Sequence, residues 1–107
     1  MANLFFNLLD SIDNKDFKLL DLVHHYSSGM KSVYTQDLVD GSYVIRQSLG
    51  GAGYSGWSGI PEIIEDINPQ VTFEGDNTVM AQQSFNFIFG LFKKLQKTKS
   101  IEVDYPL

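Results

Sequence analysis

The chain has 107 residues, of which 43% are hydrophobic and 13% aromatic, so its composition is that of a folded domain rather than a disordered segment. Thirteen acidic and eight basic residues give a formal net charge of −5, which argues against binding to a nucleic-acid backbone. The absence of cysteine excludes disulfides and thiolate metal sites, and no apolar run reaches the length of a membrane span.

The first half of the chain is predicted to be helical. A short apolar stripe at residues 3–10 predicts one brief helix. Over residues 17–49 apolar side chains recur at steps of three and four, which predicts one long amphipathic helix. Two interpretations of its glycines stay open: a kink or break near Asp40-Gly41, or the close approach of a neighbouring helix at Gly29 and Gly41.

The middle of the chain is predicted to interrupt the helices. Five of the ten residues at 50–59 are glycine, so this stretch is expected to be a loop. A short helix is predicted at 59–67, and Asn68-Pro69 ends it because the residue before proline avoids helical geometry. The stretch "QVTFE" at 70–74 reads as an extended segment.

A closing helix is predicted at 77–97, with Asp76 and Asn77 as candidate N-cap residues. The lysines at 93–99 suit the C-terminus of this helix better than a nucleic-acid patch. The predicted fold is therefore all-α, a partial helical bundle that forms one domain or fragment over residues 1–107. Its eight Phe and five Tyr exceed what so short a chain can bury, so a partner is expected to cover some of them.

The stretch "GAGYSG" at 51–56 matches the G-x-G-x-x-G pattern of dinucleotide-binding folds. In those folds a strand precedes the glycines and the third glycine opens a helix. Here the preceding periodicity is helical, and "WSGIP" delays any following helix. A dinucleotide-binding fold is therefore not expected.

Two further features have more than one interpretation. His24 and His25 point about 100° apart on a helix, and no third ligand is spaced to join them, so one core-facing and one solvent-facing histidine is expected instead of a metal site. Tyr54 and Trp57 can stack on a ligand or cover the end of a helix. The sequence leaves these two roles open.

Three stretches together resemble the acyl-CoA oxidases, which are relatives of the acyl-CoA dehydrogenases. They are "SSGMKSVYTQ", "RQSLGGAGYSGWSGIPEI" and "TFEGDNTVMAQQ". The glycine loop, the short helix and E-G-D-N-T-V follow that family's order and spacing over residues 17–92. The resemblance implies the C-terminal helical domain of these flavin enzymes, and "EGDNTVM" is typical of the oxidase branch.

The resemblance implies a chemistry for Glu74. It corresponds to the base that removes the α-proton of a fatty acyl-CoA thioester, while the β-hydrogen leaves as hydride to FAD and oxygen is then reduced to hydrogen peroxide. A carboxylate in an apolar cleft suits a general base, and Gly75 would leave room for the thioester chain. Without the resemblance, the residues favour a surface acid that stabilises the following helix dipole.

The resemblance also implies two groups of FAD-binding residues. A helix that starts after Gly75 would present free N–H groups to the FAD diphosphate. The positions that correspond to this contact are Asp76, Asn77 and Thr78. The positions that match a segment reaching the adenine side of FAD in a neighbouring subunit are Gln47, Gly50 and Gly51. This second group implies a homodimer or an association with other chains.

Family enzymes are several times longer, so this chain alone is not expected to enclose a flavin. Three interpretations stay open: part of a FAD-dependent acyl-CoA oxidase of fatty acid β-oxidation, a non-catalytic structural subunit derived from this domain, or an unrelated helical binding domain. The resemblance favours the first. It implies a peroxisome or a mitochondrion, although the chain shows no targeting signal.

Overall fold

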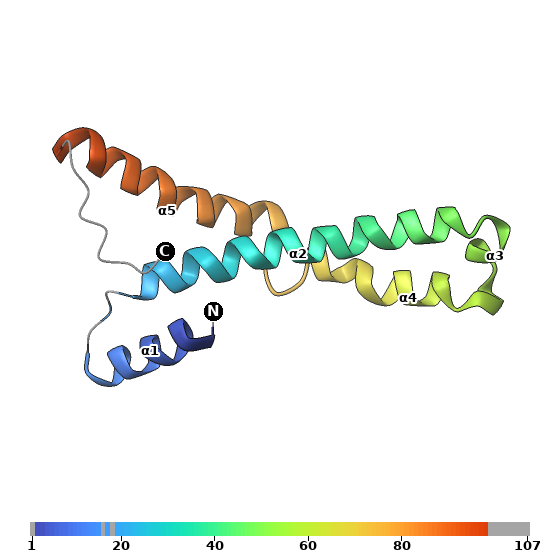
Figure 1. The fold of residues 1–107 in the computed structure, drawn as a ribbon, viewed down its shortest axis with the longest axis horizontal. Coiled ribbons are helices and arrows are strands. Elements are labelled where there is room, and N and C mark those ends of the chain that lie inside the picture. The colour runs from blue at the N-terminus through green and yellow to red at the C-terminus, as the bar shows by residue number, and fades with distance from the viewer. Residues whose placement is uncertain (1, 16, 18, 99–107) are drawn as a thin grey trace. The chain divides into compact units, whose positions relative to one another are not determined.

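The computed structural model describes residues 2–15, 17 and 19–98. These residues form five α-helices and two short 3-10 helices with no strand among them, which confirms the all-α prediction (Figure 1). The chain divides into two compact units, one made of residues 1–29 and 81–107 and the other of residues 30–80.

The first unit contains α1 (Ala2–Asp13), the beginning of α2 (Leu20–Ser48) and most of α5 (Asn77–Thr98). α1 continues beyond the predicted stretch, because its apolar stripe is followed by Ile12 on the same periodic pattern. Among the described residues of this unit, the buried apolar side chains are Leu8, Leu22 and Val23.

His25 joins α2 to α5 within the first unit. Its Nδ1 atom lies 2.8 Å from the Ser84 hydroxyl and 3.2 Å from the Ser84 carbonyl oxygen, and its ring stacks on Phe87 at 4.7 Å. His24, in contrast, is exposed, which confirms the expected difference between the two histidines. A Cβ atom on Gly29 would lie 3.1 Å from Ser84 Oγ, so the predicted close approach of a neighbouring helix is confirmed at this glycine.

α2 runs from Leu20 to Ser48 without a break, so the helix is not interrupted near Gly41. A Cβ atom on Gly41 would meet nothing within 4 Å, so close helix packing does not explain this glycine either. One glycine costs a helix about 1 kcal/mol, which the periodic apolar face of a long helix can offset.

The second unit contains the rest of α2, then α3 (Gly51–Tyr54), η1 (Gly56–Ser58), α4 (Ile60–Ile67), η2 (Asn68–Val71) and the first residues of α5. The short elements α3, η1, α4 and η2 pack on one another. The Asn68 side chain donates a hydrogen bond of 3.2 Å to the Tyr43 hydroxyl and so ties η2 to α2. Val39 and Ile64 are the buried apolar side chains of this unit.

Two predictions for this part of the chain are wrong. The glycine-rich stretch is not a plain loop, because Gly50, with φ of 59°, turns the chain after α2 and lets α3 begin at once. The stretch 70–74 is not extended, because Pro69, near the start of η2, has a fixed φ that suits a helical turn. Thr72 continues this helical geometry.

Gly53 is the glycine with the tightest surroundings. A Cβ atom there would collide with the backbone carbonyl of Arg46 and approach Leu49 Cβ to 3.0 Å. Since a backbone carbonyl in α2 cannot move aside easily, Gly53→Ala is expected to lower the free energy of unfolding of the chain by about 2 kcal/mol, measured by chemical denaturation. Gly41→Ala in the open helix interior is the matched control and is expected to raise it by about 0.5–1 kcal/mol. Equal effects of the two substitutions would contradict this packing.

Many large apolar side chains stay exposed, as the composition predicted. Trp57 is 100% exposed, Tyr54 77% and Val44 70%. Tyr54 and Trp57 therefore do not cover a helix end within this chain, which excludes one of their two interpretations. Among the described residues, no helix combines the length and the apolar character needed to cross a bilayer.

Candidate functional site

Glu74 lies in the turn between η2 and α5 and is exposed. Its φ of 57° is left-handed, so the predicted extended conformation is wrong at this residue. The next residue, Gly75, also has a positive φ, of 109°. A left-handed residue other than glycine costs about 1–3 kcal/mol and persists where the surroundings fix it, often at a functional site. The backbone at Glu74 therefore stores strain.

Gly75 is required by the local geometry. A Cβ atom on this residue would lie 2.6 Å from Met80 Cε and 3.0 Å from Met80 Sδ. The space beside Gly75 is thus taken by the Met80 side chain in this chain. Since Met80 ends in a flexible thioether, it is the positive φ more than this contact that excludes other residues.

Asp76 is the N-cap of α5. Its Oδ1 accepts a hydrogen bond of 2.9 Å from the Thr78 backbone N–H, and its carbonyl accepts one of 2.9 Å from the Met80 N–H. This confirms Asp76 as the predicted cap and places Asn77 as the first helical residue. Since the cap already satisfies the Thr78 amide, an incoming phosphate would compete with a carboxylate there.

Asn77 connects the start of α5 to α2. Its Oδ1 accepts a hydrogen bond of 2.7 Å from Lys31 Nζ and lies 3.0 Å from the Thr35 hydroxyl. Its Nδ2 donates a bond of 3.1 Å to the Ser32 carbonyl. Asn77 is half-buried, and both ends of its amide are engaged within the protein. A side chain used in this way is an anchor for the turn.

Lys31 completes the anchor. Its Nζ donates to the Gly75 carbonyl oxygen at 2.6 Å as well as to Asn77. The sequence offered no sign of this role, because a lysine in a long helix usually reads as a solvated charge. The stretch "SSGMKSVYTQ", which contains Lys31, indicated a family resemblance but not the hydrogen-bond acceptors of Lys31. These acceptors, Gly75 and Asn77, lie 44 and 46 residues further along the chain.

The second group of predicted residues lies at the junction of α2 and α3 (Figure 1). Gln47 is exposed and its Oε1 accepts a hydrogen bond of 3.2 Å from Arg46 Nη2. Gly50 and Gly51 are exposed, and a Cβ atom on either would meet nothing within 4 Å. Gln47 also borders an open surface depression lined by Tyr43, Val44, Arg46, Gln47 and Ser48.

The structure does not bring the two predicted groups together. Gln47 follows Thr35 in α2 by about three turns, which is about 18 Å along the helix axis. Thr35 contacts Asn77, so Gln47 is far from the turn that carries Glu74. The two groups therefore do not form one continuous site within this chain.

The two groups differ in how well they fit FAD. The exposed Gln47 amide and the open glycine backbone beside it can receive a polar, planar ligand. At the start of α5, Asp76 repels phosphate and the Asn77 side chain is turned to α2, so the Thr78 hydroxyl is the best-placed remaining donor.

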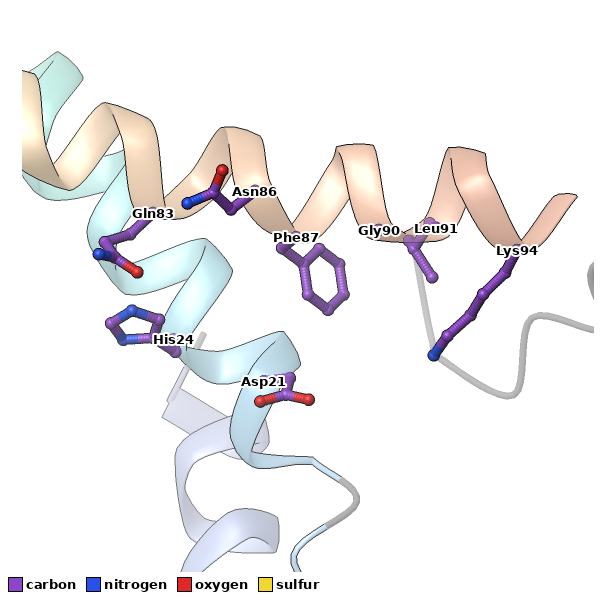
Figure 2. A pocket seen from close by; sticks show the side chains of 8 residues that line it. All are labelled: Asp21, His24, Gln83, Asn86, Phe87, Gly90, Leu91 and Lys94. Atoms are coloured by element: carbon purple, nitrogen blue, oxygen red, sulfur yellow. The ribbon is translucent and has the colours of Figure 1, made fainter. Parts of the chain in front are cut away.

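A separate recess of about 280 Å³ lies in the first unit (Figure 2). It is bordered by Asp21 and His24 of α2 and by several side chains of α5, including Phe87 and Lys94. None of the predicted site residues lines it. In the described part of the chain, no cluster of three or more histidine or acidic side chains could hold a metal ion.

Comparison with known proteins gives a consistent result. Residues 1–89 match the family described as the acyl-CoA oxidase C-alpha1 domain. Peroxisomal acyl-coenzyme A oxidase 2 of Rattus norvegicus is 30% identical over 107 residues, which are all of this chain and 16% of that protein. Peroxisomal acyl-coenzyme A oxidase 1 of Cavia porcellus is 34% identical over 101 residues, which are 94% of this chain and 15% of that protein.

A relative from a third organism gives the same result. Peroxisomal acyl-coenzyme A oxidase 1 of Dictyostelium discoideum is 35% identical over 82 residues, which are 77% of this chain and 12% of that protein. The chain thus spans about one sixth or less of the length of these relatives. The family match covers well over half of the chain. The chain belongs to the acyl-CoA oxidase family, within the region of its C-alpha1 domain.

Proposed function

We propose that this chain supplies the catalytic base of a flavin-dependent acyl-CoA oxidase that acts on fatty acyl-CoA. The observation that carries the proposal is the turn at Glu74, where a strained left-handed glutamate is fixed between η2 and the capped start of α5. Strain of this kind persists at functional sites. The relatives are named as acyl-coenzyme A oxidases, which supports the same reaction class.

Glu74 would act on the carbon next to the thioester carbonyl. Its exposed carboxylate can reach a substrate that binds beside the turn, accept the α-proton at one oxygen and hold it there. The electron pair left at the α-carbon forms the double bond as the β-hydrogen departs with its electrons. When bound, FAD supplies the acceptor for that hydride and passes the electrons to oxygen, which gives hydrogen peroxide.

Other residues would hold the cofactor. Gln47, Gly50 and Gly51 are proposed to receive the adenine side of FAD from a neighbouring copy, because they are exposed and lie far along α2 from the Glu74 turn. The Thr78 hydroxyl is proposed to contact the diphosphate side, while Asp76 remains the helix cap.

The complete assembly is proposed to contain more protein than this chain. The exposed Trp57, Tyr54 and Val44 side chains favour a further protein surface, either a second copy or other parts of an oxidase. The peroxisomal names of the relatives favour the peroxisome and give no support to the mitochondrion.

A non-catalytic structural subunit is the second candidate. It is favoured by the Asp76 carboxylate, which occupies the amide that a phosphate would use. In that case Glu74 would be inherited without serving catalysis.

The two candidates differ in one assay. The test protein is the holo-oxidase, meaning the flavin-loaded protein that contains this chain with the further protein that completes it. Addition of fatty acyl-CoA substrates over a range of chain lengths is expected to release hydrogen peroxide and to consume oxygen in equal amounts. An assembly that contains the chain but releases no peroxide with acyl-CoA substrates of any length would favour the structural subunit.

A further inference from the structure

We infer that Lys31 is a positioning residue that holds the Glu74 turn in its reactive conformation. The inference rests on the proposed function of Glu74 and adds a residue to which the sequence gave no role. Lys31 Nζ donates hydrogen bonds to the Gly75 carbonyl oxygen at 2.6 Å and to Asn77 Oδ1 at 2.7 Å. It therefore binds both the turn and the first residue of the helix that follows.

The turn needs an external contact because its backbone is unfavourable. Glu74 and Gly75 have φ values of 57° and 109°. Before them, the Phe73 N–H donates to the Pro69 carbonyl at 2.9 Å, and after them the Met80 N–H donates to the Asp76 carbonyl at 2.9 Å. Between these two points, the Gly75 carbonyl is held by Lys31. Its release would let the peptide between Gly75 and Asp76 rotate, which frees the preceding strained residue, Glu74, to move its carboxylate.

Lysine suits this position for two reasons. Its long stem lets a residue of α2 reach a carbonyl of the turn, and its ammonium group can donate to several acceptors at once. Hydrogen bonds from a charged donor are shorter and stronger than neutral ones, which fits the two short distances. Lys31 is half-buried, so water competes for its donors only in part.

The ammonium group is itself held in place. Asn77 Oδ1 accepts from Lys31, and the Asn77 amide nitrogen is fixed by its bond to the Ser32 carbonyl. The Thr35 hydroxyl lies 3.0 Å from Asn77 Oδ1 and 2.7 Å from the Lys31 carbonyl, and it can donate its single proton to one of them at a time. The rigid helix α2 thus positions Lys31, and Lys31 positions the turn.

The consequence is specific to catalysis. A small displacement of a base relative to the α-carbon slows proton transfer strongly, while the binding of the long CoA substrate elsewhere is unaffected. Lys31 should therefore influence kcat more than KM. A residue that only stabilised the fold would instead change the amount of folded, flavin-loaded protein.

The decisive variant is Lys31→Met in the holo-oxidase, because methionine keeps an unbranched apolar stem and removes the donors. The expected result is a fall in kcat of about 10²-fold, with KM for acyl-CoA within about twofold of the original value. The isotope effect with an α-deuterated acyl-CoA is expected to rise, because proton abstraction becomes rate-limiting. Lys97→Met, at an exposed lysine in the last turn of α5, is the matched control and should change neither quantity.

If Lys31→Met has the same kcat and the same isotope effect as the original protein, the inference about Lys31 is overturned, while the proposed role of Glu74 stays intact. A fully active Glu74→Gln protein would instead overturn the proposed function. If Lys31→Met does not bind flavin, Thr35→Val replaces it, because this change weakens the same anchor without removing the Lys31 donors. It is expected to lower kcat about 3-fold to 10-fold and to raise the isotope effect, and the absence of both changes would overturn the inference.

Discussion

Glu74→Gln is expected to lower kcat for acyl-CoA oxidation by about 10³-fold or more in the holo-oxidase. Glutamine has nearly the same shape as glutamate, but its amide cannot accept the α-proton at neutral pH. Because Glu74 is exposed and lies before α5 rather than within it, the free energy of unfolding should change by less than about 0.5 kcal/mol. The two quantities are measured by peroxide release and by chemical denaturation.

Glu65→Gln is the matched control for this prediction. Glu65 is an exposed glutamate within α4 of the same unit and has no proposed contact with substrate. Its replacement should leave kcat unchanged. Peroxide release from Glu74→Gln at the original rate would show that another group removes the proton.

Asn77→Ala is expected to have the largest effect on stability, a loss of about 3 kcal/mol in the free energy of unfolding. The change removes the acceptor of Lys31 and Thr35 and the donor to the Ser32 carbonyl. A hydrogen bond to a charged group contributes about 1.5–3 kcal/mol and a neutral one about 1 kcal/mol, and partial exposure of Lys31 reduces the total. Chemical denaturation of the chain with and without the substitution measures the loss.

Asn86→Ala provides the comparison for Asn77. Asn86 also lies in α5 but is exposed, so its replacement should change the free energy of unfolding by less than about 0.5 kcal/mol. Equal stability of the two alanine variants would mean that the anchor between α2 and α5 contributes nothing in solution.

The helices were predictable because their signals are local. Apolar residues at steps of three and four predicted α2 and α5, and the acidic residue before Asn77 predicted where α5 begins. The glycine-rich stretch at 50–59 was misinterpreted because a high glycine content is typical of a flexible loop. A short helix such as α3 needs only one glycine in the left-handed conformation before it, and Gly50 supplies that residue. The stretch 70–74 was misinterpreted because Pro69 fits the start of a helical turn as well as the end of a helix.

The candidate site was predictable only in part. The sequence singled out Glu74 but not its left-handed backbone, since nothing local to a Glu-Gly pair demands positive φ at the glutamate. Asn77 was expected to contact a cofactor, yet its amide is bonded to α2. Lys31 was missed because its acceptors are distant in sequence, and a single sequence carries no record of such pairs.

The flavin content and native size of this chain, isolated gently from its own source, test the central claim most directly. The account predicts that flavin co-elutes with a species larger than the chain itself, because the exposed apolar surface and the separation of the two proposed cofactor-binding groups favour an assembly with further protein. A stable species that contains the chain but carries no flavin, and takes up none when FAD is added, would contradict a role in an oxidase active site.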